Sequence, residues 1–552
     1  MANVSPWPVS SYGAKLNTVR YRYTWISPLA FSPLGQHALY FGAQVLFRSL
    51  DDGDHWQTVS PDLSAKKPDA KGCDDPNLEE ARDCGYGVIY SIAPSTLSEQ
   101  MVWVGTDDGL IHVTRDGGQS WQNVTPPSVP HWGRINTIAP SHFSVDAAYA
   151  AVDLHRTGVF RPMIIKTKDG GRTWQETIHG LPPDQFVFAV RADPERDGLL
   201  YASTNRSVFV SLDDGGHWQS LALNLPTTSF RDLLVHHGDL LAGTQGRGIW
   251  ALDNLAPLRQ MTQDLTNNTV HLFKPADAWR LRSNENRDTP PPPTTPLGQN
   301  PPSGAMIDYW LQAPATGPVT LAFQDATGTV VRRFSSDDKP ESLTANQYFQ
   351  SGWIKTEKRL SADAGMHRFI WNLRMPRPQA LAYNYKIAAV WHDGTLIGPE
   401  GALVLPGEYT VTLSADDTEL SQPLTVKLDP RVQVSTPALQ EQLALAREVT
   451  DVLGEVVQTF RTIEPLLQTR QKTHKSDALT DSLSVLTKKG KPSLSSVAGV
   501  LTSLVTAVQS ADTAPTQGQL EVFAQYRKQV DGLVRRWQAL QSKVTPAHSG
   551  SK

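Results

Sequence analysis

Two adjacent carboxylates, Asp107 and Asp108, lie in a short turn, GTDDG, between two apolar runs. Cleavage of a glycosidic bond uses two carboxyl groups placed on either side of that bond. One of them acts as general acid when its surroundings raise its pKa. Paired acids in a tight turn are usually solvated, so these two residues are weak candidates for such catalysis.

Arginine and aromatic residues occur in neighbouring turns and connections. Arg, Trp and Tyr are enriched where proteins grip their partners, although each of these residues can equally serve to cap its own turn. The pair His236-His237 has no Cys or carboxylate cluster of zinc spacing beside it, so neither a metal nor another cofactor is expected. The candidates for a ligand-binding face are Tyr86, Trp132, Arg134, His155, Arg156, Arg161, Arg206 and Arg247.

A repeated octapeptide indicates which elements position these side chains. Four copies read [ST]-x-D-x-G-x-x-W, and their tryptophans are 65, 53 and 44 residues apart. Short alternating apolar runs with turn residues between them predict strands around each copy. A period of about 40–50 residues with a Trp signature is typical of a β-propeller. The copies begin at Ser49, Thr114, Thr167 and Ser211.

Each octapeptide is expected to form a tight hairpin turn. Its Asp can cap backbone N–H groups, its Gly supplies a positive φ, and its Trp begins the next strand and packs between sheets. These residues are therefore expected to be structural rather than catalytic. They are Asp51, Gly53, Trp56, Asp116, Gly118, Trp121, Asp169, Gly171, Trp174, Asp213, Gly215 and Trp218.

The runs predict about five blades, of which the fifth, from FRDLLVHHG to GIWALDNL, has no octapeptide. In an up-and-down blade of strands A to D, the A–B and C–D turns lie on one side of the propeller. The B–C turns and the D–A connections lie on the other side. Because the octapeptides are C–D turns, the candidate ligand-binding face is the side opposite to them.

The sequence resembles the BNR/Asp-box repeat proteins of the sortilin-like (VPS10-type) group, which includes secreted bacterial proteins labelled glycosyl hydrolases. The segments that carry the likeness are YRYTW, VLFRSLDDGDHW, VWVGTDDGLIHVTRDGGQSW, FRPMIIKTKDGGRTW, GLLYASTNRSVFVSLDDGGHWQSL and GTQGRGIWALDNLAPLRQ. The resemblance implies a propeller of more than five blades, with further N-terminal blades lost by truncation or carried on a separate chain. It also implies an extracellular or periplasmic protein. It does not select an activity, because the octapeptide also occurs in sialidases, xyloglucanases, photosystem assembly factors and sortilins.

The second half changes in composition. After the blades, expected at 1–268, a bridging segment and a Pro-rich linker occupy 269–304. Alternating strands at 305–432 predict an Ig- or FlgD-like β-sandwich, and helical spacing of apolar residues at 433–552 predicts an α-helical hairpin or bundle. Thr436 is expected to cap its first helix, with Pro437 in the first turn. The fold class is therefore mainly β, with a partial propeller, a sandwich and a helical segment.

Composition limits the partners and leaves the compartment open. Lys plus Arg is 51 and Asp plus Glu is 55, so the net charge of −4 argues against a nucleic-acid partner. No apolar run is long enough to span a membrane. Met1–Phe31 shows no secretory signal. Cys73 and Cys84 lie in one loop as a disulfide or as two free thiols, and a disulfide would indicate an oxidising compartment.

No complete catalytic constellation is visible in the sequence. The favoured hypothesis is therefore a secreted propeller module that binds a protein, peptide or glycan ligand without catalysis of its own. The alternative is a propeller-type glycoside hydrolase that acts on a polysaccharide through carboxylates on the same face.

Overall fold

The computed structural model describes residues 3–9, 20–22, 26–65, 86–262, 265–282, 298, 300–339, 345–346, 359–385, 397–473, 477–489 and 491–544. The chain separates into two compact units, Met1–Thr262 and Gln263–Lys552. Among the described helices, none is both long and apolar enough to cross a membrane. Cys73, Cys84 and most of the predicted Pro-rich linker lie outside the described residues.

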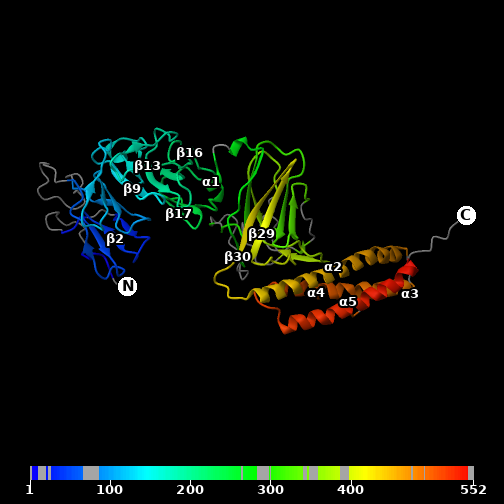
Figure 1. Cartoon of the computed structure of the whole chain (residues 1–552). Helices are drawn as coiled ribbons and strands as arrows, with labels where there is room; N and C mark the ends of the chain where they lie inside the picture. The colour runs from blue at the N-terminus through cyan, green and yellow to red at the C-terminus, as the bar shows by residue number, and fades with distance from the viewer. Residues whose placement is uncertain are drawn as a thin grey trace. The chain divides into compact units, whose positions relative to one another are not determined.

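The first unit consists of five antiparallel sheets, which confirms a mainly β fold with propeller blades (Figure 1). Blades 1 to 4 each have four strands in sequence order, and blade 5 has three. A short helix, α1 (Ala256–Gln260), follows blade 5. The strands are β1 (Leu29–Phe31), β2 (Leu39–Gly42), β3 (Leu46–Ser49) and β4 (Gln57–Thr58) in blade 1; β5 (Ile89–Pro94), β6 (Val102–Thr106), β7 (Ile111–Thr114) and β8 (Gln122–Asn123) in blade 2; β9 (Arg134–Pro140), β10 (Ala148–Asp153), β11 (Ile164–Thr167) and β12 (Gln175–Glu176) in blade 3; β13 (Val187–Ala192), β14 (Leu200–Thr204), β15 (Val208–Ser211) and β16 (Gln219–Ser220) in blade 4; and β17 (Phe230–His236), β18 (Asp239–Thr244) and β19 (Ile249–Leu252) in blade 5.

The octapeptide turns are held by their own side chains. In blade 3, Asp169 accepts hydrogen bonds from the backbone N–H of Thr173 at 2.9 Å and from its hydroxyl at 2.7 Å. The Thr167 hydroxyl donates to Asp169 and accepts from the N–H of Gly171, each at 2.9 Å. The bonds from Thr173 lower the pKa of Asp169 to about 2, because they favour the charged carboxylate.

The same turns also lock each blade to the blade before it. The indole N–H of the octapeptide Trp donates to a backbone carbonyl just after strand D of the preceding blade. The octapeptide Gly lies against that same residue, and a Cβ on Gly171 would stand 2.7 Å from the Val124 Cβ. The indole bonds are Trp121 to Val59 at 2.8 Å, Trp174 to Val124 at 2.8 Å and Trp218 to Thr177 at 3.0 Å.

Apolar side chains fill the spaces between successive blades. Between blades 2 and 3, Trp103 and Ile111 pack against Ile138 and Ala150, and all four side chains are buried. Burial of this apolar area is the main force that joins the blades. The blades therefore stack through repeated, similar interfaces.

The second unit begins with two facing sheets that share one apolar core. Trp371 and Phe323 stack at 4.2 Å between them. One sheet contains β20 (Val270–Leu272), β22 (Ala305–Leu311) and β26 (Gly365–Trp371). The other contains β21 (Ala278–Arg280), β30 (Thr418–Leu428), β29 (Gly407–Ala415), β23 (Thr320–Asp325) and β24 (Val330–Ser335), and a small third sheet contains β25 (Ala345–Asn346), β27 (Tyr383–Tyr385) and β28 (Ile397–Gly398).

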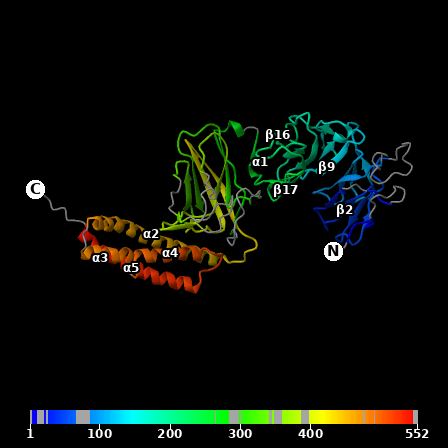
Figure 2. The same cartoon turned by 180° about the vertical axis from the view of Figure 1, so that it is seen from behind.

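Helices follow the sandwich, and the helices labelled α2, α4 and α5 lie side by side in both views (Figures 1 and 2). Apolar residues on their facing sides form one core, which agrees with the helical spacing seen in the sequence. The helices are α2 (Thr436–Lys472), α3 (Ala478–Ser484), which continues as a π-helical turn at Val485–Lys489, α4 (Leu494–Val508) and α5 (Gln517–Val544).

The predicted cap of α2 is wrong by one residue. Ser435 is the N-cap: its backbone is extended, and its hydroxyl accepts from the N–H of Ala438. Thr436 is the first helical residue. Both are capping types, so the sequence alone does not choose between them. The finer boundaries predicted for the linker, sandwich and helical segment stay predictions.

Candidate ligand-binding face of the blades

The carboxylates of Asp107 and Asp108 lie inside the protein, contrary to the expectation that they are solvated. Their residues are 5% and 1% exposed. Asp107 accepts from the N–H of Val88 at 2.7 Å. Asp108 accepts from the N–H of Ala65 at 2.7 Å and from the hydroxyl of Thr106. Both acids thus tie the β6–β7 turn to the connection that leads into blade 2.

Burial raises the pKa of Asp108, because water no longer solvates its charge. The bonds from Thr106 and Ala65 lower the pKa but do not cancel this effect. A raised pKa is one property of a general acid. The other property is access to a substrate, and a carboxyl group that is 1% exposed with both oxygens bonded to the protein lacks it.

The turn between β10 and β11 is the longest of the five turns that join the second and third strands of a blade. It comprises ten residues, Leu154–Met163, whereas the four corresponding turns of the other blades have three or four. Asp153 accepts from the N–H of His155 at 3.0 Å and contacts the His155 Nδ1 at 2.5 Å. A 3₁₀ turn then ends at Gly158, whose φ is 82°. This capping fixes the His155 ring at the base of a long loop.

An aromatic patch surrounds this loop, formed by His155, Val159, Phe160, Phe186 and Phe188. The His155 ring stacks on Phe186 at 4.5 Å, and the Phe160 ring lies 6.1 Å from Phe186. Val159 is 41% exposed and Phe160 is 56% exposed. Phe186 and Phe188 come from the connection into blade 4 and the start of β13, so the patch bridges two blades.

The Asp153–His155 pair has the form that orients a general base in nucleophilic catalysis. That chemistry also needs a hydroxyl or thiol bonded to the imidazole. Within the residues that the structure describes, the ring of His155 has a hydrogen-bonded partner only in Asp153. The pair therefore positions the loop and the ring, and a nucleophile is lacking among these residues.

Most of the candidate arginines are already engaged. Arg161 pairs with Glu176 at 2.9 Å and Arg206 with Asp184 at 2.6 Å. Arg156 and Arg247 are exposed, and the backbone carbonyl of Arg247 accepts from the Trp250 indole at 3.0 Å. These arginines lie in the turns on the loop side of the blades, where Arg161 and Arg206 are each paired with a carboxylate.

Tyr86, Trp132 and Arg134 form a second group, near blade 2. Arg134 is 7% exposed and lies over the ring of Tyr90, with its guanidinium carbon 4.3 Å from the ring centroid. The ring of Tyr86 lies beneath Arg22 at 5.5 Å. The N–H of Trp132 donates to the carbonyl of Asp108 at 2.9 Å. Arg134 is buried in this group, whereas Tyr86 and Trp132 are half-buried, so the group exposes less than the Val159-Phe160 tip does.

Sequence reasoning missed Val159, Phe160, Phe186 and Phe188. One signal was present: Val159-Phe160 is an apolar pair inside an otherwise polar turn, HRTGVFRP. Arg231 was also missed. It lies over Phe188 at 4.4 Å and donates to Gln245, so it covers one side of the patch.

The sequence matches no protein family model and no curated protein. Among solved structures, a xyloglucanase of family GH74 from Xanthomonas campestris is 15% identical, with coverage of 73% of this chain and 80% of that chain and a TM-score of 0.31. YCF48 from Cyanidioschyzon merolae is 18% identical, with coverage of 30% and 53% and a TM-score of 0.24. This chain thus spans about half the length of the YCF48 chain. Both TM-scores are low, so the assignment of the fold rests on the sheets and strand order described above and not on these likenesses.

Proposed function

We propose that the blades form a sortilin-like binding module that takes an apolar segment of a peptide or protein on the aromatic patch, without catalysis of its own. The resemblance of the octapeptides further supports a secreted protein. The observation that carries the proposal is the exposed Val159-Phe160 tip, held against the stacked rings of His155 and Phe186.

The patch has the physical character of a binding hot spot. Exposed aromatic side chains on a rigid base gain free energy when a partner removes them from water, and they lose little conformational entropy. The base is rigid because Asp153 caps the turn and the His155 ring stacks on a Phe186 that is 9% exposed. The neighbouring Arg161 and Arg206 are already paired. Apolar contact is therefore the expected main source of affinity.

The alternative, a glycoside hydrolase, is less well supported by the same residues. Two carboxyl groups must flank the scissile bond. Asp107 and Asp108 are buried and bonded to backbone N–H groups. The raised pKa of Asp108 has a sufficient cause in its burial.

A random-peptide phage library panned against the full chain tests the proposal. We expect the selected peptides to share an aromatic or aliphatic residue, and we expect Phe160→Ala to weaken their binding by about tenfold or more. The matched control is Phe143→Ala, because Phe143 is 47% exposed in the β9–β10 turn on the opposite side of blade 3. Binding is measured by biolayer interferometry.

Three results would contradict the proposal. Peptides that bind Phe160→Ala as well as the unmodified chain would place the ligand elsewhere. Turnover of chromogenic glycosides or polysaccharides that Asp107→Asn or Asp108→Asn abolishes, with the melting temperature unchanged, would establish the hydrolase instead. Binding on a glycan array that depends on Phe160 would keep the site but change the ligand class.

A further inference from the structure

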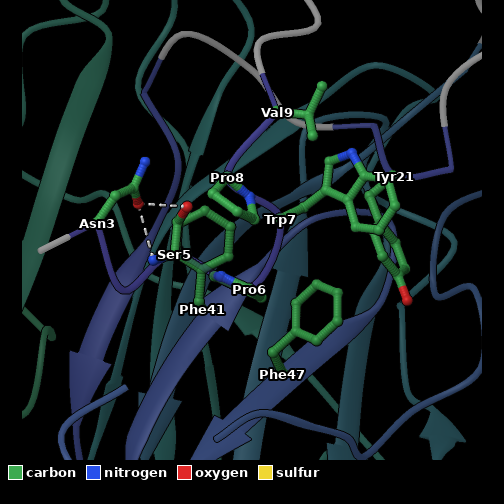
Figure 3. Close-up of a pocket in the computed structure, with 9 residues that line it drawn as sticks. All are labelled: Asn3, Ser5, Pro6, Trp7, Pro8, Val9, Tyr21, Phe41 and Phe47. Carbon is green, nitrogen blue, oxygen red and sulfur yellow. Dashed lines mark hydrogen bonds between the residues drawn. The ribbon is translucent and has the colours of Figure 1, made fainter. Parts of the chain in front are cut away.

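Two of the cavities among the described residues fall within the usual size range of ligand pockets, about 300–1,000 Å³. One has a volume of about 370 Å³, lies beside blade 1 and is lined in part by Trp7, Tyr21 and Phe47 (Figure 3). Its lining residues carry no charge, and the side chains of Asn3 and Ser5 are hydrogen-bonded to each other at 2.8 Å. That lining therefore does not select an occupant by charge. The other cavity, of about 460 Å³, lies among the helices and has charged walls.

The second cavity is a groove between two helical segments. On each wall the lining residues recur after about one helical turn, so each wall is a single stripe of a helix. A third helix can lie in such a groove, because its own ridges of side chains pack between those of the two walls. One wall consists of Asp481, Ser482, Val485 and Leu486, from α3 and its π-helical turn, and the other of Arg536, Ala539, Leu540 and Lys543, from α5.

The middle of the groove is apolar. Leu486 is 3% exposed and Leu540 is half-buried, whereas Val485 is 47% exposed. Within the described part of 436–544, only Val485 and Leu520 are large apolar side chains with more than 40% of their area exposed. The π-helical turn begins at Val485, and such turns occur frequently at functional sites. A partner that covers Val485 would gain free energy by removing this apolar area from water.

Two positive charges lie on the α5 wall without a compensating carboxylate. Arg527 pairs with Glu455 at 3.5 Å, but Arg536 and Lys543 have no ion-pair partner among the described residues. Lys543 lies in the last turn of α5, where a cation complements the helix dipole. Arg536 lies two turns before the end, beyond the reach of that effect. The two cations are seven positions apart, about 10 Å along the helix axis.

We propose that this groove is a docking site for an acidic amphipathic helix of a partner protein. A helix that lies along α5 has the same rise per residue, so acidic side chains at its positions i and i+7 match the spacing of Arg536 and Lys543. Apolar side chains at positions i+3 and i+4 then lie between the charges and cover Val485. Surface ion pairs are individually weak, so apolar contact holds the occupant and the charges select its sign and register.

A second copy of this chain does not supply such a helix from α2. That helix has exposed acids at the required spacing, Glu441 and Glu448. The apolar residue four positions after Glu441 is Leu445, which is 5% exposed because it packs in the core of its own helices. It is therefore not available to cover Val485. The proposal concerns the helices alone and does not depend on the function proposed for the blades.

The test measures binding of synthetic helical peptides to the full chain by fluorescence anisotropy. The probe peptide carries two Glu seven positions apart, with Leu at the third and fourth positions after the first Glu. One control peptide has Lys in place of both Glu, and another has Ser in place of both Leu. We expect the probe to bind about tenfold or more tightly than either control, and its affinity to fall as the salt concentration rises.

Variants of the chain show whether the groove is the site. Changing Arg536→Glu together with Lys543→Glu should reverse the preference, so that the Lys peptide binds more tightly than the probe. Val485→Asp should weaken binding of the probe about tenfold or more. The matched controls are Lys528→Glu, an exposed cation of α5 outside the groove, and Leu520→Asp, whose parent side chain is 45% exposed at the start of α5. Both should bind the probe as the unmodified chain does, and all variants should keep its melting temperature.

Four outcomes would overturn the proposal. The Lys peptide could bind as tightly as the probe, or the double charge reversal could leave the preference unchanged. Vesicles that contain phosphatidylglycerol could bind in a manner that depends on Val485 while the probe does not, which would make a lipid surface the occupant. Finally, the chain alone could form a dimer that Val485→Asp dissociates, which would make a second copy the occupant.

Discussion

Replacing Asp108 by asparagine tests whether this carboxyl group is a structural tie or a catalytic acid. The side chain is buried, and its two oxygens accept from Ala65 and Thr106. Burial raises its pKa in the folded protein above the unfolded value of about 3.9. An acid of this kind is protonated more readily when folded, so its contribution to stability is full below about pH 3.9. The contribution is lost as the pH rises through the folded pKa.

The size of the effect follows from linkage. Between the unfolded and the folded pKa, the folded state holds about one more proton than the unfolded state. Its stability then falls by about 1.4 kcal/mol for each pH unit. The asparagine side chain does not titrate, so the variant lacks this contribution. The free energy of unfolding of the unmodified chain should therefore fall relative to that of Asp108→Asn as the pH rises from about 4, and then level off.

The assay is urea unfolding followed by tryptophan fluorescence between about pH 4 and pH 7. Nine of the 15 tryptophans lie at or before Trp250, so the signal reports mainly on the blades. Asn123→Ala is the control: neither side chain titrates, so this variant should differ from the unmodified chain by a nearly constant free energy. A constant difference for Asp108→Asn, or one that moves in favour of the unmodified chain with rising pH, would refute the reasoning.

Two further predictions concern packing. Asp512→Ala should lower the free energy of unfolding of the second unit by about 3–5 kcal/mol, because it leaves the guanidinium of Arg280, 1% exposed, buried without its carboxylate partner; urea unfolding checks this, and a loss under about 1 kcal/mol would contradict it. Gly171→Ala should lower the melting temperature more than Gly158→Ala. Both glycines have positive φ, but only Gly171 meets Val124, whereas Gly158 has open space; equal effects would contradict the interlock between blades.

Much of the blade architecture could be predicted from the sequence because its determinants are local. In each octapeptide, the Asp, Gly and Trp lie within six residues and form the turn largely among themselves. The alternating runs around them specify strands in the same way. The helical segment was also predictable from its apolar spacing, but its cap was misplaced, at Thr436 instead of Ser435, and α3 was not predicted.

The candidate site was less predictable because burial depends on distant segments. Asp108 is bonded to Ala65, 43 residues earlier in the sequence, so the GTDDG turn itself carries no sign that its acids are enclosed. In the same way, Phe186 meets His155 only because blades 3 and 4 are adjacent. Sequence reasoning chose mainly charged residues in these turns and overlooked the exposed apolar pair Val159-Phe160.

The two sides of a blade are under different physical constraints. On the octapeptide side, Gly171 and Trp174 contact Val124 of the preceding blade, so a longer side chain or loop there would separate two blades. On the opposite side, a Cβ at Gly158 would have nothing within 4 Å. A turn of ten residues can therefore extend from blade 3 without disturbing an interface, and its tip can be apolar at little cost to the fold. The stability of the blades and the binding of a ligand are thus separated in space, which is why Phe160→Ala should alter ligand binding and leave the melting temperature nearly unchanged.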